Sequence, residues 1–363
     1  MVDSMPSSAG TRRTTWVWLW LVIVPVPAIA EEPHHGQSVC SERTSLRSTG
    51  TVNLRIDNDL FGGVGQDQGY SNGFLVSWVS PNLVDYRNDP CLPGIVQALN
   101  RGLALLQPEG FDEQNMTVGL GQMMYTPTDR ERRDLVTDDR PYAGALMLGL
   151  GYNARRGDSL GTSQLRLGVV GPAAHAGEVQ DEWHRLLGID RFRGWDNQLH
   201  DELVVQVIHE RRTRVIRHES ATGWGWDLTR HWGGSLGNFA TYANLGGELR
   251  FGLRLPDDFG TAPLRPAGEN TSPLHEPTSH AGSAHVFVAY DARAVLYDIT
   301  LDGNAFRSSH RVDKRPLVAD VTYGVAMVHG RWRIALARYH RTREFRGQKE
   351  VPVYGTLTIG RRF

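Results

Sequence analysis

Gln180 and His184 are the residues of this sequence whose types and spacing point most directly to catalysis. They lie four residues apart in "EVQDEWHRLLG", a spacing that puts two side chains on the same face of a helix. A neutral imidazole can take a proton from a nucleophile, which makes His184 the best candidate for a general base. A lone histidine is more often structural, so the assignment depends on its surroundings.

Asn58 and Asp59 form a second polar candidate, at the end of an alternating stretch. In "VNLRIDNDLFGG", from Val52 to Gly63, apolar and polar residues alternate until this pair interrupts the pattern. Ca²⁺ binds carboxylate and carbonyl oxygens and tolerates irregular loops. Asp59 therefore suits a principal metal ligand, and Asn58 suits either the metal or a hydrogen bond to the substrate. The alternative interpretation of both residues is an ordinary turn at a strand end.

Ser71, in "DQGYSNGF", offers a hydroxyl. It is either a nucleophile activated by His184, or a residue that orients the substrate while His184 activates water. We favour water, because a metal, a histidine and a donor suffice without a covalent intermediate. The local pattern by itself has a third interpretation, because Asn72-Gly73 is typical of a hairpin turn.

The stretch "YTPTDRERRDLVTDDRPYAG", from 125 to 144, carries the candidates for substrate binding. Arginine forms paired hydrogen bonds to phosphate oxygens, so Arg130 and Arg132 are candidates for holding an anionic head group. A solvated charged loop explains the same arginines equally well. Tyr142 is expected at the rim of the site.

Apolar and polar residues alternate in segments of about ten along most of the chain, which indicates β-strands. Near the C-terminus Leu317, Val321 and Val325 alternate with Asp320 and Thr322 in this way. The predicted strands are 51–58, 73–80, 115–123, 143–153, 162–170, 202–213, 223–232, 239–254, 284–300, 315–328, 331–343 and 352–363.

The pattern predicts an all-β protein, a closed antiparallel transmembrane barrel of about twelve strands with a short helix in an extracellular loop. One face of the segments is apolar and the other polar, as expected for lipid outside and a polar lumen inside. Aromatic residues near segment ends, among them Trp78, Tyr339 and Tyr354, fit interfacial girdles. With the N-terminus in the periplasm, Asn58 and Asp59 fall at the extracellular rim of the lumen. A soluble secreted sandwich is the alternative.

The N-terminal 30 residues have the pattern of a secretory signal peptide, with Arg12 and Arg13 before an apolar run that ends at Ala28-Ile29-Ala30. Residues 31–363 then form the barrel domain. The chain has two cysteines, Cys40 and Cys91, which export would allow to form a disulfide. The formal net charge of −1 gives no basic field for nucleic acid.

Two further segments interrupt the strand pattern. The sequence "LPGIVQALNRGLALL", from 92 to 106, predicts a short amphipathic helix. The Pro-, Gly- and His-rich stretch from 256 to 282 is interpreted as a solvated linker rather than a metal-binding loop.

Five stretches, in this order, resemble the lipid A 3'-O-deacylase family of the Gram-negative outer membrane: "DND" at 57–59, "GYSNG" at 69–73, "DRPYAG" at 139–144, "GEVQxxxH" at 177–184 and "GWDNQ" at 194–198. The likeness runs across nearly the whole mature chain. It implies a twelve-stranded barrel with a Ca²⁺-dependent site facing the outer leaflet, which removes the 3'-linked acyloxyacyl chain from lipid A of lipopolysaccharide. His184 would be the base and Asp59 the metal ligand, with Gln180, Asn58 and Ser71 around the ester.

The expected partners are thus lipid A and the outer-membrane bilayer, and the expected state is a monomer. Two rival functions fit a barrel of this kind. One is an outer-membrane phospholipase, which is expected to carry a serine and a histidine close together on a strand. The other is a non-catalytic porin-like barrel, for which the pair Gln180 and His184 has no purpose.

Overall fold

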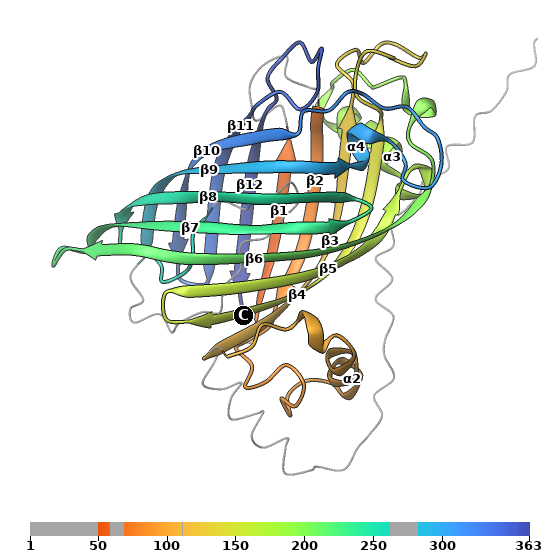
Figure 1. Cartoon of the computed structure of the whole chain (residues 1–363). Coiled ribbons are helices and arrows are strands. Elements are labelled where there is room, and N and C mark those ends of the chain that lie inside the picture. The colour runs from red at the N-terminus through yellow and green to blue at the C-terminus, as the bar shows by residue number, and fades with distance from the viewer. Residues whose placement is uncertain (1–49, 59–68, 111, 262–281) are drawn as a thin grey trace, which may run out of the picture.

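The chain forms a closed antiparallel β-barrel, as predicted (Figure 1). The computed structural model describes residues 50–58, 69–110, 112–261 and 282–363. Consecutive strands are neighbours throughout, and β1 pairs with β12 to close the sheet. Closure satisfies the backbone groups that an open edge would leave unpaired in lipid. The predicted signal peptide, Cys40 and Asp59 lie outside the described residues, so the bridge from Cys40 to Cys91 stays a prediction.

The elements have the following bounds. The strands are β1 (Thr51–Asn58), β2 (Gly69–Val79), β3 (Glu113–Thr126), β4 (Ala143–Arg156), β5 (Ser159–Val170), β6 (Glu202–Glu219), β7 (Trp224–Gly237), β8 (Ala240–Leu253), β9 (Ser283–Asp298), β10 (Leu317–His329), β11 (Trp332–Arg341) and β12 (Val353–Arg362). The helices are α2 (Gly94–Gly102), α3 (Ala176–Leu187) and α4 (Ile299–Asp302), with 3₁₀ turns η2 (Ala104–Leu106), η3 (Pro172–Ala174) and η4 (Trp195–Asn197).

The largest difference from the prediction that affects the candidate site is in β2, which begins four residues earlier than predicted. Asn72 pairs with Asn58 of β1, so Asn72 and Gly73 lie inside the strand and the hairpin-turn interpretation is wrong. Cross-strand pairing outweighs the local turn preference of this dipeptide. The register shifts between Tyr70 and Asn72, which makes Ser71 the extra residue of a β-bulge.

The two faces of the barrel wall differ as the alternation predicts. On β10 the outward residues Leu317 and Val321 are exposed, whereas Asp320 is buried inside. Tyr339 and Tyr354, predicted for an interfacial girdle, instead stack inside the barrel with ring centroids 4.6 Å apart. Interior arginines explain their position, because the guanidinium of Arg341 lies 5.8 Å from the Tyr354 ring.

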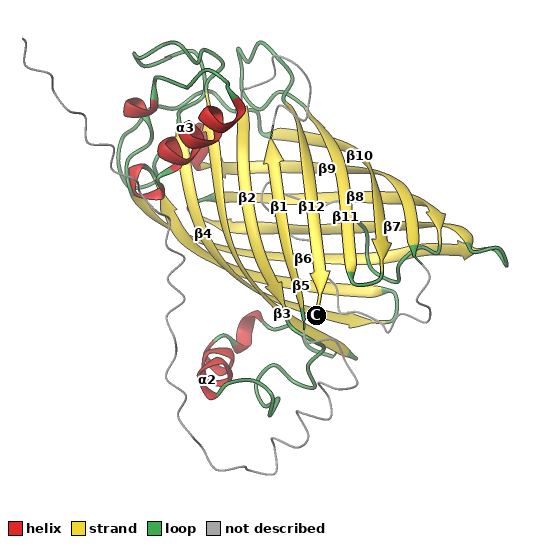
Figure 2. Cartoon of the chain, turned by 180° about the vertical axis from the view of Figure 1, so that it is seen from behind, coloured by secondary structure: helices red, strands yellow, loops and turns green. Residues whose placement is uncertain are grey.

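The segment between β2 and β3 folds against the outside of the wall. Its predicted helix is confirmed as α2, and Tyr86 packs on Tyr152 of β4 with centroids 5.1 Å apart. Tyr152 is fully buried although it belongs to the outward row of β4. Both views show α2 outside the barrel, at the end where β3 begins (Figures 1 and 2). We name this the α2 end and the opposite end the α3 end.

None of the helices among the described residues is long and apolar enough to cross a membrane.

The first part of the 256–282 stretch enters the lumen at the α2 end, which corrects its interpretation as a solvated linker. Phe259 is fully buried, with the guanidinium carbons of Arg155 and Arg214 5.4 and 5.1 Å from its ring. Asp258 forms ion pairs with Arg250 of β8 and, at 3.3 Å, with Arg333 of β11. These contacts join strands on several sides of the barrel. The rest of the stretch, 262–281, lies outside the described residues.

Asp258 should make the barrel sensitive to acid. Burial alone raises the pKa of its carboxyl, but Arg250 and Arg333 outweigh burial and lower the pKa to about 2. A folded-state pKa below the unfolded value of about 3.9 stabilises the fold above pH 4, and this stabilisation is lost as the pH falls towards 2. We expect Asp258→Asn to lose about 2 kcal/mol of stability at pH 7 and to flatten the pH dependence between 4 and 2.

The measurement is the unfolding midpoint, followed by heat-modifiable gel mobility over this pH range. Asp313→Asn is the control, because its carboxylate forms only an exposed pair with Arg346. Equal acid sensitivity of wild type and Asp258→Asn would contradict the assignment.

Candidate active site

Helix α3 covers the outer surface of the wall at the α3 end (Figure 2). Gly144, in the outward row of β4, lies directly beneath it: a Cβ on Gly144 would stand 2.3 Å from the Cβ of Ala176. Gln122 of β3 donates to the carbonyl of Ala174 at 2.6 Å, just before the helix. Trp183 on α3 packs on Phe74 of β2 with ring centroids 5.5 Å apart. The close approach requires glycine at 144 and brings the helix onto three strands.

Ser71 and Gln180 meet between the wall and α3. The Gln180 amide nitrogen donates to the Ser71 hydroxyl at 3.2 Å, and that hydroxyl donates to the carbonyl of Met124 at 3.3 Å. The indole N–H of Trp195 donates to the Gln180 amide oxygen at 2.8 Å. Since both ends of the Gln180 amide are bonded, its orientation is fixed: oxygen towards Trp195 and nitrogen towards Ser71.

His184 lies one turn further along the same face of α3. It is buried, as Gln180 is. Its Nδ1 lies 2.7 Å from the carbonyl oxygen of Asp190. A carbonyl oxygen only accepts, so Nδ1 carries the proton and Nε2 of the neutral ring is the acceptor. This is the tautomer in which Nε2 can take a proton.

Aromatic side chains surround the imidazole. Phe192 packs against His184 with ring centroids 5.7 Å apart, and Tyr142 lies 6.2 Å from the Phe192 ring and 5.2 Å from that of Trp195. The guanidinium of Arg130 stands 5.8 Å from the Phe192 ring. Tyr142 and Arg130, both predicted to bind substrate, therefore lie next to the Phe192 ring, which also packs against His184.

Two asparagines from neighbouring strands complete the described part of the site. Asn58 donates from its amide nitrogen to the carbonyl of Ser71 at 3.4 Å. Asn72 pairs with Asn58 across the strands and is 1% exposed. Neither its amide nitrogen nor its amide oxygen has a hydrogen-bond partner among the described residues. A buried amide without partners is unfavourable on its own, so Asn72 is available for a group that enters the site.

The donor set fits a hard cation in part. Among the described residues no three His, Cys, Asp or Glu side chains form a metal cluster. Ca²⁺ also binds amide and backbone carbonyl oxygens, and the described part of the chain gives the amide oxygen of Asn72 no hydrogen-bond partner. The predicted carboxylate ligand, Asp59, follows Asn58 directly but lies outside the described residues.

The site lies on the outward face of the wall, which corrects the expectation that it lies at the rim of the lumen. Asp57 points inward, where it accepts from Tyr70 at 2.7 Å and pairs with Arg55 at 2.6 Å. The next residue, Asn58, must therefore point outward. A molecule in a surrounding lipid layer could reach this site without entering the barrel.

The structure brings together Asn58, Ser71, Gln180 and His184, with Tyr142 and Arg130 at their border. Arg132 is exposed. Sequence reasoning missed Asn72, which it placed in a turn, and Trp195, which it named only within the motif "GWDNQ". For Trp195 the available signal was the position of "GWDNQ" shortly after the helix.

Comparison with known proteins agrees with the barrel fold. A family model described as "Outer membrane protein LpxR" matches residues 16–363. The solved structure of LpxR from Salmonella typhimurium is similar with a TM-score of 0.68 and 18% identity, covering 86% of this chain and all of the other. The β-domain of the Bordetella autotransporter BrkA is much less similar, with a TM-score of 0.39 and 9% identity over 87% of this chain and 98% of the other.

A search of curated proteins gave no match. The family match spans nearly the whole chain, includes all five motifs and agrees with the fold. This chain therefore belongs to the LpxR family of outer membrane proteins, the lipid A 3'-O-deacylase family that its motifs resemble.

Proposed function

We propose that this protein is an ester hydrolase that removes the 3'-linked acyloxyacyl chain from lipid A of lipopolysaccharide. One observation supports this most: the buried group of Ser71, Gln180 and His184 lies between α3 and the outward face of the wall. A lipid can reach such a site by lateral diffusion in the membrane. We orient the barrel with the α3 end outside the cell, so that the site faces the outer leaflet, and we expect a monomer.

His184 acts as the general base on water in this proposal. The carbonyl of Asp190 holds Nδ1–H, so Nε2 takes a proton from the water as its oxygen attacks the ester carbonyl carbon. When the tetrahedral intermediate collapses, the imidazolium returns the proton to the sugar oxygen that leaves. The products are a free fatty acid and a lipid A hydroxyl group.

Ser71 positions the substrate and is not the nucleophile. Its proton is directed at the carbonyl of Met124, and its oxygen accepts from Gln180. A serine that attacks must instead give its proton to the base. The Gln180 and Asn72 amides lie near the reacting ester, where N–H donors stabilise a developing oxyanion.

We propose Ca²⁺ as the cofactor, held by Asp59 together with amide oxygens of Asn58 and Asn72. A bound cation polarises the ester carbonyl and stabilises the negative charge that develops on its oxygen. Arg130, beside the Phe192 ring, is the proposed contact for a lipid A phosphate. Arg132, whose side chain is exposed, is the second proposed contact for a phosphate.

The two rivals explain less of the structure. For a porin, the filling of the lumen by Phe259 and its arginines works against conduction, and a buried histidine under α3 has no purpose. A phospholipase of the kind considered would carry its serine and histidine on a strand. Here His184 is on helix α3, and the hydroxyl proton of Ser71 points to the carbonyl of Met124. Phospholipid release by the purified protein separates this rival from the proposal.

His184→Ala should lower the rate of lipid A deacylation by about 10²- to 10⁴-fold, the range for loss of a general base. Mass spectrometry of lipid A treated with the purified protein measures this, with added Ca²⁺ and with chelator, and chelation should abolish the wild-type reaction. His175→Ala is the matched control, since that histidine precedes α3 and its side chain is 72% exposed. Unchanged acylation by the wild type with Ca²⁺ would refute the proposed activity.

Ser71→Ala should keep the rate within about tenfold of wild type, because it removes one hydrogen bond and no nucleophile. A loss above a thousandfold, or an acyl adduct on Ser71 in the intact-protein mass, would instead assign covalent catalysis to Ser71.

Trp195→Phe should lower kcat about 2- to 10-fold, which corresponds to one hydrogen bond of about 0.5–1.5 kcal/mol. The substitution removes the N–H that orients Gln180 and keeps an aromatic ring at that position. Trp183→Phe is the control, because the indole N–H of Trp183, on the helix that carries Gln180, has no partner within the described ranges. Equal effects of the two substitutions would show that orientation of Gln180 is unimportant.

A further inference from the structure

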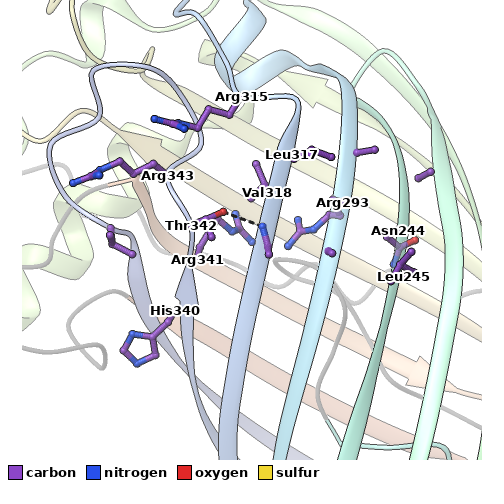
Figure 3. A pocket seen from close by; sticks show the side chains of 15 residues that line it. Asn244, Leu245, Arg293, Arg315, Leu317, Val318, His340, Arg341, Thr342 and Arg343 are labelled. Atoms are coloured by element: carbon purple, nitrogen blue, oxygen red, sulfur yellow. Dashed lines mark hydrogen bonds between the residues drawn. The ribbon is translucent and has the colours of Figure 1, made fainter.

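A groove on the outer surface of the wall lies away from the candidate active site, over β8 to β11 at the α3 end (Figure 3). Its volume is about 810 Å³. In the closed order of strands, β12 separates β11 from β1, which carries Asn58. The groove is thus formed by a part of the barrel that the proposed reaction does not use.

Small side chains make the floor of this groove. Ala292 on β9 pairs with Leu245 on β8 and with Ala319 on β10, and Ala294 pairs with Leu317. The alanine side chains are shorter than the large apolar side chains beside them, such as Leu245 and Leu317, so the surface is recessed at the alanines.

The direction of the alanine side chains follows from their neighbours on the same strands. Asp291 and Arg293 flank Ala292 on β9 and form an ion pair at 2.8 Å inside the barrel. Arg293 also pairs with Asp320, the neighbour of Ala319 on β10. Since successive side chains alternate between faces, the alanines point outward, and the groove is continuous with the outward apolar surface.

Two arginines stand at the rim of the groove. Arg315 precedes β10 and Arg343 follows β11. The backbone N–H of Arg315 donates to the backbone carbonyl of Glu344 at 2.7 Å, which holds the two loops together. Figure 3 shows both guanidinium groups on the same side of the groove, above His340. The guanidinium of Arg315 has no partner among the described residues, and that of Arg343 donates only to the carbonyl of Lys349.

Two of the nearby acids are paired with other arginines. Glu344 is buried and turned inward, where it binds Arg140 at 3.0 Å and Arg341 at 3.1 Å. Asp313 pairs with Arg346. A third arginine, Arg338, lies in the outward row of β11 opposite Tyr323, and no described residue is a hydrogen-bond partner of its Nε. Charged side chains on a lipid-facing surface are unfavourable unless they are paired, most of all far from the interface.

We propose that this groove is a second, non-catalytic binding site for lipopolysaccharide of the outer leaflet. An acyl chain of lipid A lies over the alanine floor, and a lipid A phosphate binds Arg315 and Arg343. The apolar recess matches the acyl chains of this lipid, and the cationic rim matches its phosphates. Arginine binds phosphate oxygens in paired hydrogen bonds. The inference uses the proposed orientation of the barrel but does not require that the protein hydrolyses lipid A.

The test uses full-length protein refolded in detergent and carrying His184→Ala, so that bound lipid A is not hydrolysed. Purified lipid A is added, and masses of the intact complexes give the number of molecules bound. We expect Arg315→Glu with Arg343→Glu to lower the occupancy of one lipid A at least tenfold, and Ala294→Trp, which fills the groove, to do the same. A lipid A molecule bound at the active site adds the same mass in every variant, so a difference in occupancy between variants reports binding in the groove.

Arg307→Glu with Arg346→Glu is the matched control, because it changes the net charge equally on residues that do not line the groove. Gel mobility before and after heating shows which variants are folded. Undiminished occupancy in the folded groove variants would overturn the proposal. Equal occupancy by phosphatidylglycerol in a parallel titration would overturn the assignment to lipopolysaccharide.

Discussion

The contact between α3 and the wall is the constraint on which the site depends. A helix lies this close to a sheet only where a strand residue has no side chain, and Gly144 beneath Ala176 meets that need. The helix then carries Gln180 and His184 to the level of Ser71 on β2. Neither the strand nor the helix could form the site alone, because its hydrogen bonds run between them.

The barrel makes that contact rigid. Inside the wall, behind the site, Arg55 pairs with Asp57, and Tyr70 packs on Tyr354 with ring centroids 5.2 Å apart. Such pairs are costly to break once buried, so they resist movement of the strands. A site on the outer surface keeps its geometry because the interior behind it is filled.

The barrel itself was predictable from the sequence, since alternation is a local signal that recurs in every strand. The pair Gln180 and His184 was predictable for the same reason, because helix spacing depends only on nearby residues. Asn72 was not, as its local pattern indicates a turn and only the pairing with Asn58 places it in a strand. Trp195 could not be assigned to Gln180, because a loop brings it back to the helix.

The same alternation explains why the site faces outward and not into the lumen. Polar residues at a strand end suggest a lumen rim, yet a single residue decides the face: Asp57 points inward and Asn58 outward. The bulge at Ser71 adds one residue to β2, so that Tyr70 points inward to Asp57 while Asn72, opposite Asn58, points outward. The arrangement suits the proposed function, since a lipid substrate need not leave the bilayer to reach His184.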